Sequence, residues 1–257
     1  DPVVLLTLSA LIIIGGLGFL AWENIARKRS LRKFSVYTKL VLLITAALLA
    51  VGWAGTCLLE WNNPETLGGM TVGEKLLNGF FQSATLRTAG FAAIDQAKLT
   101  ESGKAFSCVL MFIGGSSGST AGGIKTVTFL VLVLTIWARA RGKSTVCAFK
   151  RTIPDEQTQN AMIIAFIVLA LAVFGGIFIS ATSPMSFTDA VYEAVSALAT
   201  VGLSAGGTAS LSIPAQILII IYMYFGRVGV LTISLGFLAG NRAEERFRYA
   251  ETNLLIG

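Results

Sequence analysis

The sequence of 257 residues contains no histidine and few charged residues. Histidine is the most common general base and metal ligand in proteins, so its absence argues against an enzyme and against the usual kind of metal centre. The three cysteines, Cys57, Cys108 and Cys147, are an odd number without a framework spacing, which favours structural thiols over disulfides. Only 13% of the residues are charged while 54% are hydrophobic, and this hydrophobic fraction is more than the core of a soluble protein needs. The composition therefore predicts an integral membrane protein that is not an enzyme.

Five apolar runs are long enough to cross a hydrocarbon core of roughly 30 Å, which takes about 20 helical residues. The chain lacks the short alternating strands of a transmembrane barrel, and a spanning backbone must otherwise satisfy its own hydrogen bonds as a helix. We therefore expect an all-α membrane fold in which the third and fifth runs are longer than one span requires. The runs cover residues 3–22, 40–59, 105–137, 161–180 and 213–239.

Basic residues cluster after the first, third and fifth runs, and Lys and Arg near span ends are retained on the cytoplasmic side. Residues 60–104 and 181–212 should then face outside, and the C-terminus should be cytoplasmic. The net charge of +6 needs no nucleic acid to explain it, because basic loops beside spans are attracted to the surface of the lipid bilayer. The basic clusters are Arg27, Lys28, Arg29, Arg32, Lys33 and Lys39; Arg139, Arg141, Lys143, Lys150 and Arg151; and Arg242, Arg246 and Arg248.

Each outer segment contains an amphipathic stretch too short to cross the membrane, at residues 75–85 and 187–199. We interpret both as re-entrant helices, whose negative C-terminal ends favour a cation while the backbone carbonyls that follow replace its hydration shell. Glycine is needed at such a turn because it allows positive φ and a close backbone approach. The stretches run into two tetrapeptides that would form an ion filter: Thr88, Ala89, Gly90 and Phe91, and Thr200, Val201, Gly202 and Leu203.

The glycines recur at a fixed spacing. The interval from Gly90 to Gly202 equals the interval from Gly114 to Gly226, and the second pair lies in the spans that follow the loops. This equal spacing predicts an internal repeat of span, re-entrant helix, glycine loop and second span. The glycine pair at 15–16 matches the break at Gly114, which would put the preceding loop glycine before the first residue of this chain. We therefore expect part of at least one further repeat to be missing here.

The middle of the third run, residues 114–125, holds five Gly, three Ser and one Thr. Small residues also let membrane helices pack closely, but this composition is poor for helix continuity. We expect an unwound segment, which survives at membrane depth only where it is buried in protein or lines water. Such a loop under the filter could gate the pore. The expected gate consists of Gly114, Gly115, Ser116, Ser117, Gly118, Ser119, Thr120, Ala121, Gly122 and Gly123.

Two basic residues lie within the third and fifth apolar runs. Arg227 lies mid-span, where a charge is usually paired or faces a pore. It could hydrogen-bond the exposed carbonyls of a broken helix, or repel passing cations as part of the gate, and these roles are compatible. Lys125 is expected to be a capping or interfacial residue that does not contact ions.

Through residues 87–91, 114–125, 200–203 and 226–229, essentially the whole chain resembles the potassium-translocating subunits of the Trk/Ktr/HKT superfamily, most closely the bacterial Ktr type. The resemblance implies a potassium-channel-like fold of four span–loop–span repeats around one pore. Residues 1–38 would then hold the second span of repeat two and a cytoplasmic loop, residues 39–152 would form repeat three, and residues 153–257 would form repeat four with a cytoplasmic tail.

The resemblance also implies a function. K⁺ would enter the cell across the plasma membrane, bound in the filter by the backbone carbonyls of Thr88, Ala89, Thr200 and Val201. K⁺ would be the transported ion rather than a cofactor, with Na⁺ as a modulator. The expected partners are a second copy of the subunit and a cytosolic nucleotide-binding ring of the RCK/KTN type, similar to KtrA or TrkA.

Two alternatives remain at this stage, a coupled secondary cation transporter and a non-conducting membrane scaffold. Broken helices and internal repeats also mark secondary transporters, but their repeats are commonly inverted. The repeats here are parallel, with both loops entering from the outer side, which favours a pore. The scaffold reading depends on the missing repeats being truly absent from the protein.

Overall fold

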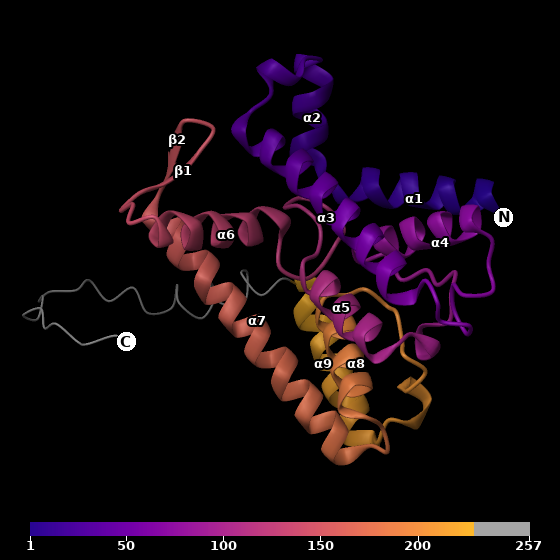
Figure 1. Ribbon diagram of the computed structural model, residues 1–257. Helices are drawn as coiled ribbons and strands as arrows, with labels where there is room; N and C mark the ends of the chain where they lie inside the picture. The colour runs from indigo at the N-terminus through magenta and orange to yellow at the C-terminus, as the bar shows by residue number, and fades with distance from the viewer. Residues whose placement is uncertain (229–257) are drawn as a thin grey trace, which may run out of the picture.

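The structure is a computed structural model that describes residues 1–228, and it is helical apart from one short hairpin (Figure 1). The elements follow one another with short 3₁₀ turns in three of the loops. They are α1 (Pro2–Gly16), α2 (Phe19–Lys28), α3 (Val36–Glu60), α4 (Val72–Thr85), α5 (Glu101–Phe112), α6 (Thr126–Ala140), β1 (Val146–Ala148), β2 (Arg151–Ile153), α7 (Asp155–Thr182), α8 (Phe187–Leu198) and α9 (Ile213–Val228).

Among the described residues, α3 and α7 are long and apolar enough to cross a membrane unaided. Helices α1 and α2 pass the same test only as a pair, and they are bent by 92° at the break between them. The run predicted over residues 3–22 is therefore a broken span, and the break directly follows the glycine pair at 15–16. The helix stops because Gly18 adopts a φ of +80°, which a right-handed helix does not contain.

The third apolar run is divided into α5 and α6, with a non-helical segment between them where the glycine- and serine-rich residues lie. This agrees with the expectation of an unwound segment. The fifth predicted run begins with α9 at Ile213, but its end falls outside the described residues, as do Arg242, Arg246 and Arg248.

Helices α4 and α8 correspond to the two short amphipathic stretches, and both begin at a hydroxyl cap. Thr71 and Glu74 form a reciprocal capping box at the start of α4, in which the Thr71 amide donates to Glu74 Oε2 over 2.9 Å. Hydrogen bonds from the hydroxyl and then the amide of Thr71 lower the pKa of the Glu74 carboxyl. Ser186 caps α8 by accepting a 3.1 Å hydrogen bond from the amide of Asp189. These caps set where the two short helices start.

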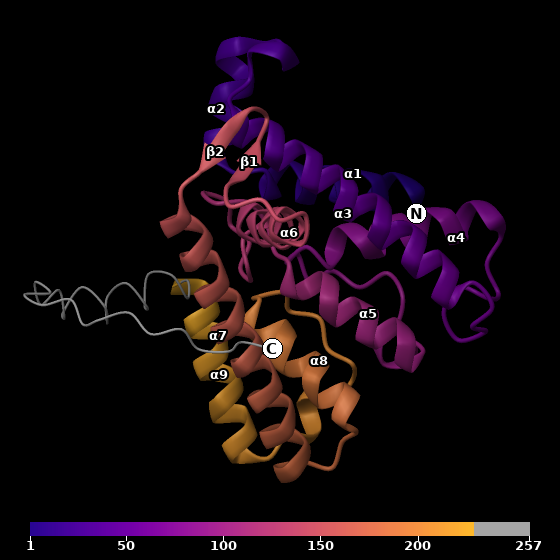
Figure 2. The same ribbon diagram turned by 60° about the vertical axis from the view of Figure 1, so that its left-hand side comes forward.

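Helix α8 packs against α5, α7 and α9, and both ribbon views show it beside α7 and α9 (Figures 1 and 2). Two glycines on α7 permit this approach. A Cβ at Gly175 would lie 2.6 Å from the Tyr222 ring, and a Cβ at Gly176 would overlap the Val191 side chain. The Tyr222 hydroxyl donates a 2.6 Å hydrogen bond to the Leu171 carbonyl of α7, so α9 is tied to the same surface. Small residues let the helices come close enough for dispersion contacts to hold them together.

A buried carboxylate joins the C-terminal end of α3 to the N-terminal end of α5. Glu60 is only 1% exposed, and its Oε1 accepts hydrogen bonds from the amide of Thr100 at 3.0 Å and from its hydroxyl at 2.6 Å. Its Oε2 accepts from Asn63 at 2.6 Å and from the Thr66 hydroxyl at 2.8 Å. Because Thr100 is the N-cap of α5, the position of that helix is coupled to the end of α3.

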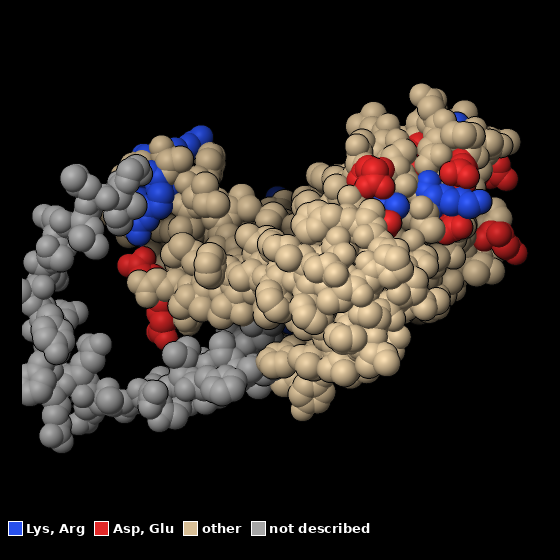
Figure 3. Space-filling view, turned by 90° about the horizontal axis from the view of Figure 1, so that it is seen from below, with Lys and Arg blue, Asp and Glu red and all other residues tan. Residues whose placement is uncertain are grey.

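Charged side chains on the face in Figure 3 gather at two opposite ends, and a broad region between them carries none. A band of this kind is what a bilayer core requires of the surface that faces it. The arrangement supports placing the chain in a membrane with its charged loops on either side.

Replacing Glu60 by Ala should lower the free energy of unfolding by about 2–3 kcal/mol, because several buried donors would lose their acceptor together. Thermal unfolding of the purified protein in detergent measures the loss. Glu65→Ala is the matched control, since the Glu65 side chain is exposed and accepts no hydrogen bond within residues 1–228. Equal losses in the two variants would contradict the role assigned to Glu60.

Candidate functional site

The two glycine loops share an unusual backbone conformation. Thr88 and Gly90 have φ values of +64° and +82°, and Thr200 and Gly202 have +54° and +89°. Positive φ is rare for a β-branched residue and points to a functional constraint when tertiary structure enforces it. Left-handed residues at alternate positions reverse the peptide planes between them, so successive carbonyls can face one side rather than alternate. A line of carbonyls on one side is what a dehydrated cation needs.

Hydroxyl groups at the ends of α4 and α8 hold the loops in this shape. Thr85 Oγ1 donates to the Phe91 carbonyl over 2.7 Å, and Ser196 Oγ donates to the Leu203 carbonyl over 2.6 Å. The backbone follows the same scheme, with Ala89 N bonded to Thr85 O at 3.1 Å and Val201 N bonded to Ser196 O at 2.8 Å. Each loop is therefore clasped to the last turn of the helix before it.

The fold brings these loops together although Gly90 and Gly202 are 112 residues (202 − 90) apart in the chain. A Cβ added at Gly90 would overlap the carbonyl oxygen of Val201, and a Cβ at Gly202 would lie 3.9 Å from Gly90 Cα. The close approach needs glycine at position 90. The two predicted filter segments thus meet backbone to backbone.

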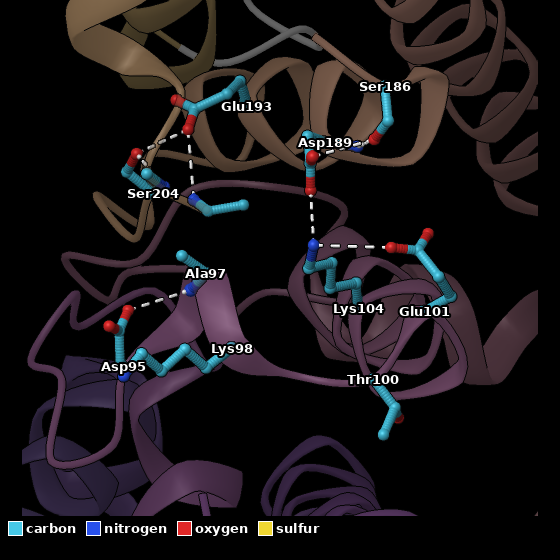
Figure 4. A network of polar contacts seen from close by, with 12 residues as sticks. Asp95, Ala97, Lys98, Thr100, Glu101, Lys104, Ser186, Asp189, Glu193 and Ser204 are labelled. Atoms are coloured by element: carbon cyan, nitrogen blue, oxygen red, sulfur yellow. Dashed lines mark hydrogen bonds and ion pairs between the residues drawn. The ribbon is translucent and has the colours of Figure 1, made fainter. Parts of the chain in front are cut away.

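Buried polar side chains hold the segments next to the two glycine loops. Glu193 on α8 is 5% exposed and accepts hydrogen bonds from Ser204 Oγ at 2.5 Å, Ala205 N at 3.1 Å and Thr208 Oγ1 at 2.8 Å. Figure 4 shows Glu193 directed at Ser204 in the segment that follows the second loop. The guanidinium of Arg87 lies behind the first loop, with two long 3.5 Å contacts to Thr45 of α3.

Two polar clusters that the sequence did not predict join α8 to α5 and to the segment that follows the first glycine loop. Lys104 on α5 donates to Asp189 of α8 over 2.7 Å and lies 3.5 Å from Glu101 (Figure 4). In the second cluster, Gln96 Oε1 accepts from Gln82 of α4 at 2.6 Å and from the Tyr192 hydroxyl of α8 at 3.0 Å. No local sequence pattern could have revealed these contacts, because Lys104 and Asp189 are 85 residues apart and Gln96 and Tyr192 are 96 residues apart.

The segment between α5 and α6 forms a loop whose two ends are joined by backbone hydrogen bonds. Gly114 N donates to Ile124 O at 2.9 Å, Ile124 N donates to Phe112 O at 3.1 Å, and Thr126 N donates to Gly115 O at 3.0 Å. Residues 114–123 are thereby presented as a loop, which we call the intramembrane loop.

The intramembrane loop meets the second glycine loop. A Cβ at Gly122 would lie 2.5 Å from the Ala199 carbonyl oxygen and would overlap Thr200 Oγ1. Gly226 of α9 approaches the same place, since a Cβ there would overlap the Leu198 carbonyl oxygen and lie 2.9 Å from Thr200 Cγ2. Glycines at 122 and 226 therefore allow three backbone segments to converge at Thr200.

Two cationic side chains bind adjacent carbonyls of the intramembrane loop. Arg227 Nη1 donates to Thr120 O over 2.9 Å, which agrees with the expected bond to an exposed carbonyl. Lys125 Nζ donates to Ala121 O over 2.5 Å. Lys125 occupies the N-cap position of α6 but makes no side-chain cap, so its contact with the loop was missed by the sequence analysis.

Two cavities adjoin the glycine loops. One of about 500 Å³ is lined by Thr200, Gly202 and Arg227, among others. The other, of about 380 Å³, lies against α1 and is lined by Thr88 and Thr120, among others. The second cavity thus joins the first glycine loop to the intramembrane loop, whereas the first joins the second glycine loop to Arg227 of α9.

These features define an α-helical membrane transport protein built from re-entrant glycine loops above an intramembrane loop. The chain belongs to the TrkH family of cation transport proteins, which matches residues 1–245. Membership confirms the resemblance to Trk and Ktr subunits and the prediction that the chain is not an enzyme.

Similar proteins cover the whole chain. It is 38% identical to the potassium/sodium uptake protein NtpJ of Enterococcus hirae, covering 99% of this chain and 57% of that protein. It is also 38% identical to the Ktr system potassium uptake protein B of Vibrio alginolyticus, over 100% of this chain and 56% of that protein. The chain therefore spans about half the length of these relatives.

A solved structure supports the fold. The potassium transporter TrkH from Vibrio parahaemolyticus superimposes with a TM-score of 0.70 over 91% of this chain and 52% of that one, at 18% sequence identity. The likeness confirms the expected helical membrane architecture of spans and re-entrant segments.

Replacing Gly90 by Ala should destabilise the protein, because the left-handed backbone alone costs a non-glycine residue about 1–2 kcal/mol and the new methyl group meets Val201. Thermal unfolding in detergent would report this as a lower midpoint. Gly69→Ala is the control, because a Cβ at Gly69 meets no atom within 4 Å and its φ is not positive. The two variants behaving alike would refute the close approach of the loops.

Proposed function

We propose that the protein takes up K⁺ through a channel-like pore, with the two glycine loops as part of the selectivity filter and the intramembrane loop as its gate. The observation that carries this proposal is the matched pair of loops, each with positive φ at Thr and Gly and each clasped by a helix hydroxyl. Two segments so far apart in the chain would not share so strained a conformation without a common task.

In this proposal the backbone carbonyls of Thr88, Ala89, Thr200 and Val201 bind K⁺ in place of water. Helices α4 and α8 end at these loops, so their negative C-terminal ends favour a cation there. The contact between Gly90 and the Val201 carbonyl keeps the loops in register with one another.

The gate consists of residues 114–123 with Arg227. The intramembrane loop lies against Thr200 through Gly122, and Arg227 places a positive charge on the carbonyl of Thr120. A cation leaving the filter would meet both the loop and this charge, so conduction requires the loop to move. Lys125 adds a second charge on the next carbonyl of the loop.

The remaining proposals rest on the family. Residues 39–152 and 153–257 would be repeats three and four, and residues 1–38 the end of repeat two, around a single pore. We propose a homodimer in the plasma membrane with a cytoplasmic C-terminus, docked on a cytosolic nucleotide-binding ring. The relatives named for the Ktr system and for potassium/sodium uptake support such a partner and a modulating role for Na⁺.

The complete native protein in proteoliposomes should take up ⁸⁶Rb⁺ in a manner blocked by K⁺, with Na⁺ competing to a degree that reports selectivity. Gly90→Asp should lower uptake about tenfold or more, since a rise of about 1.4 kcal/mol in the barrier suffices. Gly69→Asp is the control at an open surface position. Correctly inserted wild-type protein without any uptake would favour the transporter or scaffold interpretations.

Removing the gate should increase the flux of cations. Arg227→Ala should preserve the fold and raise uptake, and deletion of residues 118–121 should produce a leak. Arg139→Ala removes the same charge from an exposed position and should leave uptake unchanged. Unchanged uptake in the deletion would disprove the gating role, and failure of Arg227→Ala to assemble would assign Arg227 a structural role only.

A further inference from the structure

The two halves of the intramembrane loop are held in different ways. The first half, residues 116–118, is bonded to the break between α1 and α2. Ser116 donates to the Gly16 carbonyl through its amide at 3.0 Å and its hydroxyl at 2.6 Å, and its hydroxyl also contacts the Leu17 carbonyl. Phe19 N donates in return to Gly118 O at 3.1 Å.

A fourth element adds to this attachment. The Tyr37 hydroxyl of α3 donates to the Ser117 carbonyl over 3.0 Å. Ser116 itself is fully buried. The first half thus bonds the backbone of one broken span and the side chain of the next helix.

The second half, residues 119–123, has no backbone hydrogen bond to another element in the part of the chain that the structure describes. Ser119 bonds back to Ser116 within the loop, through its hydroxyl at 2.6 Å. Among residues 1–228 outside the loop, only the flexible side chains of Arg227 and Lys125 bind the carbonyls of Thr120 and Ala121. Long side chains can follow or release a carbonyl without any change in the helices that carry them.

The first attachment is costly to break. Helix α1 ends at Gly16, so its last carbonyls lose their helical partners at the 92° bend. An unsatisfied carbonyl at membrane depth costs several kcal/mol, and Ser116 supplies the donors that prevent this. Release of the first half would expose polar groups of both the bend and the loop at once.

The second half of the intramembrane loop also lies next to the second glycine loop and beside a cavity. It contains Gly122, the residue in contact with Thr200 of the second glycine loop. Thr120 and Ala121 line the 380 Å³ cavity beside the first glycine loop. The halves therefore differ in attachment and in position relative to the filter.

We propose that Ser116 is a positioning residue that anchors residues 116–118 to the α1–α2 break, and that only residues 119–123 swing away when the pore opens. The inference rests on the proposed gating function of the intramembrane loop. It adds an asymmetric hinge, in which Ser116 holds the fixed side and the two cationic side chains hold the moving side.

Nitroxide labels on the complete protein test this without any measurement of flux. The label sites are Ser117→Cys and Thr120→Cys, whose native side chains make no hydrogen bond within residues 1–228. The background carries Cys147→Ser, because Cys147 is exposed while the other two cysteines are buried. Arg227→Ala should increase label mobility at position 120 and leave the spectrum at position 117 unchanged. Equal loosening at both positions would overturn the hinge.

The anchor has its own variants. Ser116→Ala should increase mobility at position 117 and raise the ⁸⁶Rb⁺ leak about fivefold, the factor for one net hydrogen bond of about 1 kcal/mol. Ser116→Thr keeps the hydroxyl and should restore both readouts. Ser144→Ala is the matched control, at an exposed position where the hydroxyl makes no hydrogen bond in the described chain.

An unchanged spectrum at position 117 in Ser116→Ala would overturn the anchoring role. If neither wild type nor any variant conducts cations while the labels behave as expected, the proposed function fails and the hinge stands. If the protein takes up ⁸⁶Rb⁺ and Gly90→Asp lowers that uptake, but the labels at positions 117 and 120 loosen equally, the hinge fails and the proposed function stands.

Discussion

The structure depends on one constraint, that backbone amides and carbonyls at membrane depth must find partners within the protein. At the broken helices described above, another part of the chain supplies the partner. The carbonyls at the end of α1 accept from Ser116 of the intramembrane loop, and the Thr120 carbonyl of that loop accepts from Arg227 of α9. The irregular segments are therefore mutually dependent, which allows a membrane protein to keep strained backbone beside a cavity.

Close backbone contact is the second requirement, and glycine meets it. At Gly90 the two glycine loops meet, and at Gly122 and Gly226 the intramembrane loop and α9 converge on Thr200. A side chain at any of these positions would force apart segments that are in close backbone contact. Polar side chains have a different role, since Glu193 holds the segment that follows the second glycine loop and Glu60 joins the end of α3 to the start of α5.

Much of this arrangement was predictable from the sequence. The short helices α4 and α8 appeared as amphipathic stretches with boundaries within a few residues, because their caps and their length leave local traces. The unwound segment followed from glycine and serine content. The match of the glycine pair at 15–16 to Gly114 indicated a break in the first span, but the 92° bend was not predicted, because an apolar run has the same composition whether it is straight or bent. The contact of Lys125 was also missed, since a lysine beside a helix start is usually a cap or an interfacial residue.

By itself the sequence determined the membrane setting, the equal spacing of the repeated glycines and the identity of the glycine loops, because hydropathy, spacing and residue type can be read along the chain. The tertiary structure alone decided which loops touch and which half of the intramembrane loop is bonded to the α1–α2 break. It also decided that Lys104 of α5 meets Asp189 of α8. Such contacts join residues far apart in the chain, and they arise only once the helices have packed and the broken segments have found partners for their backbone groups.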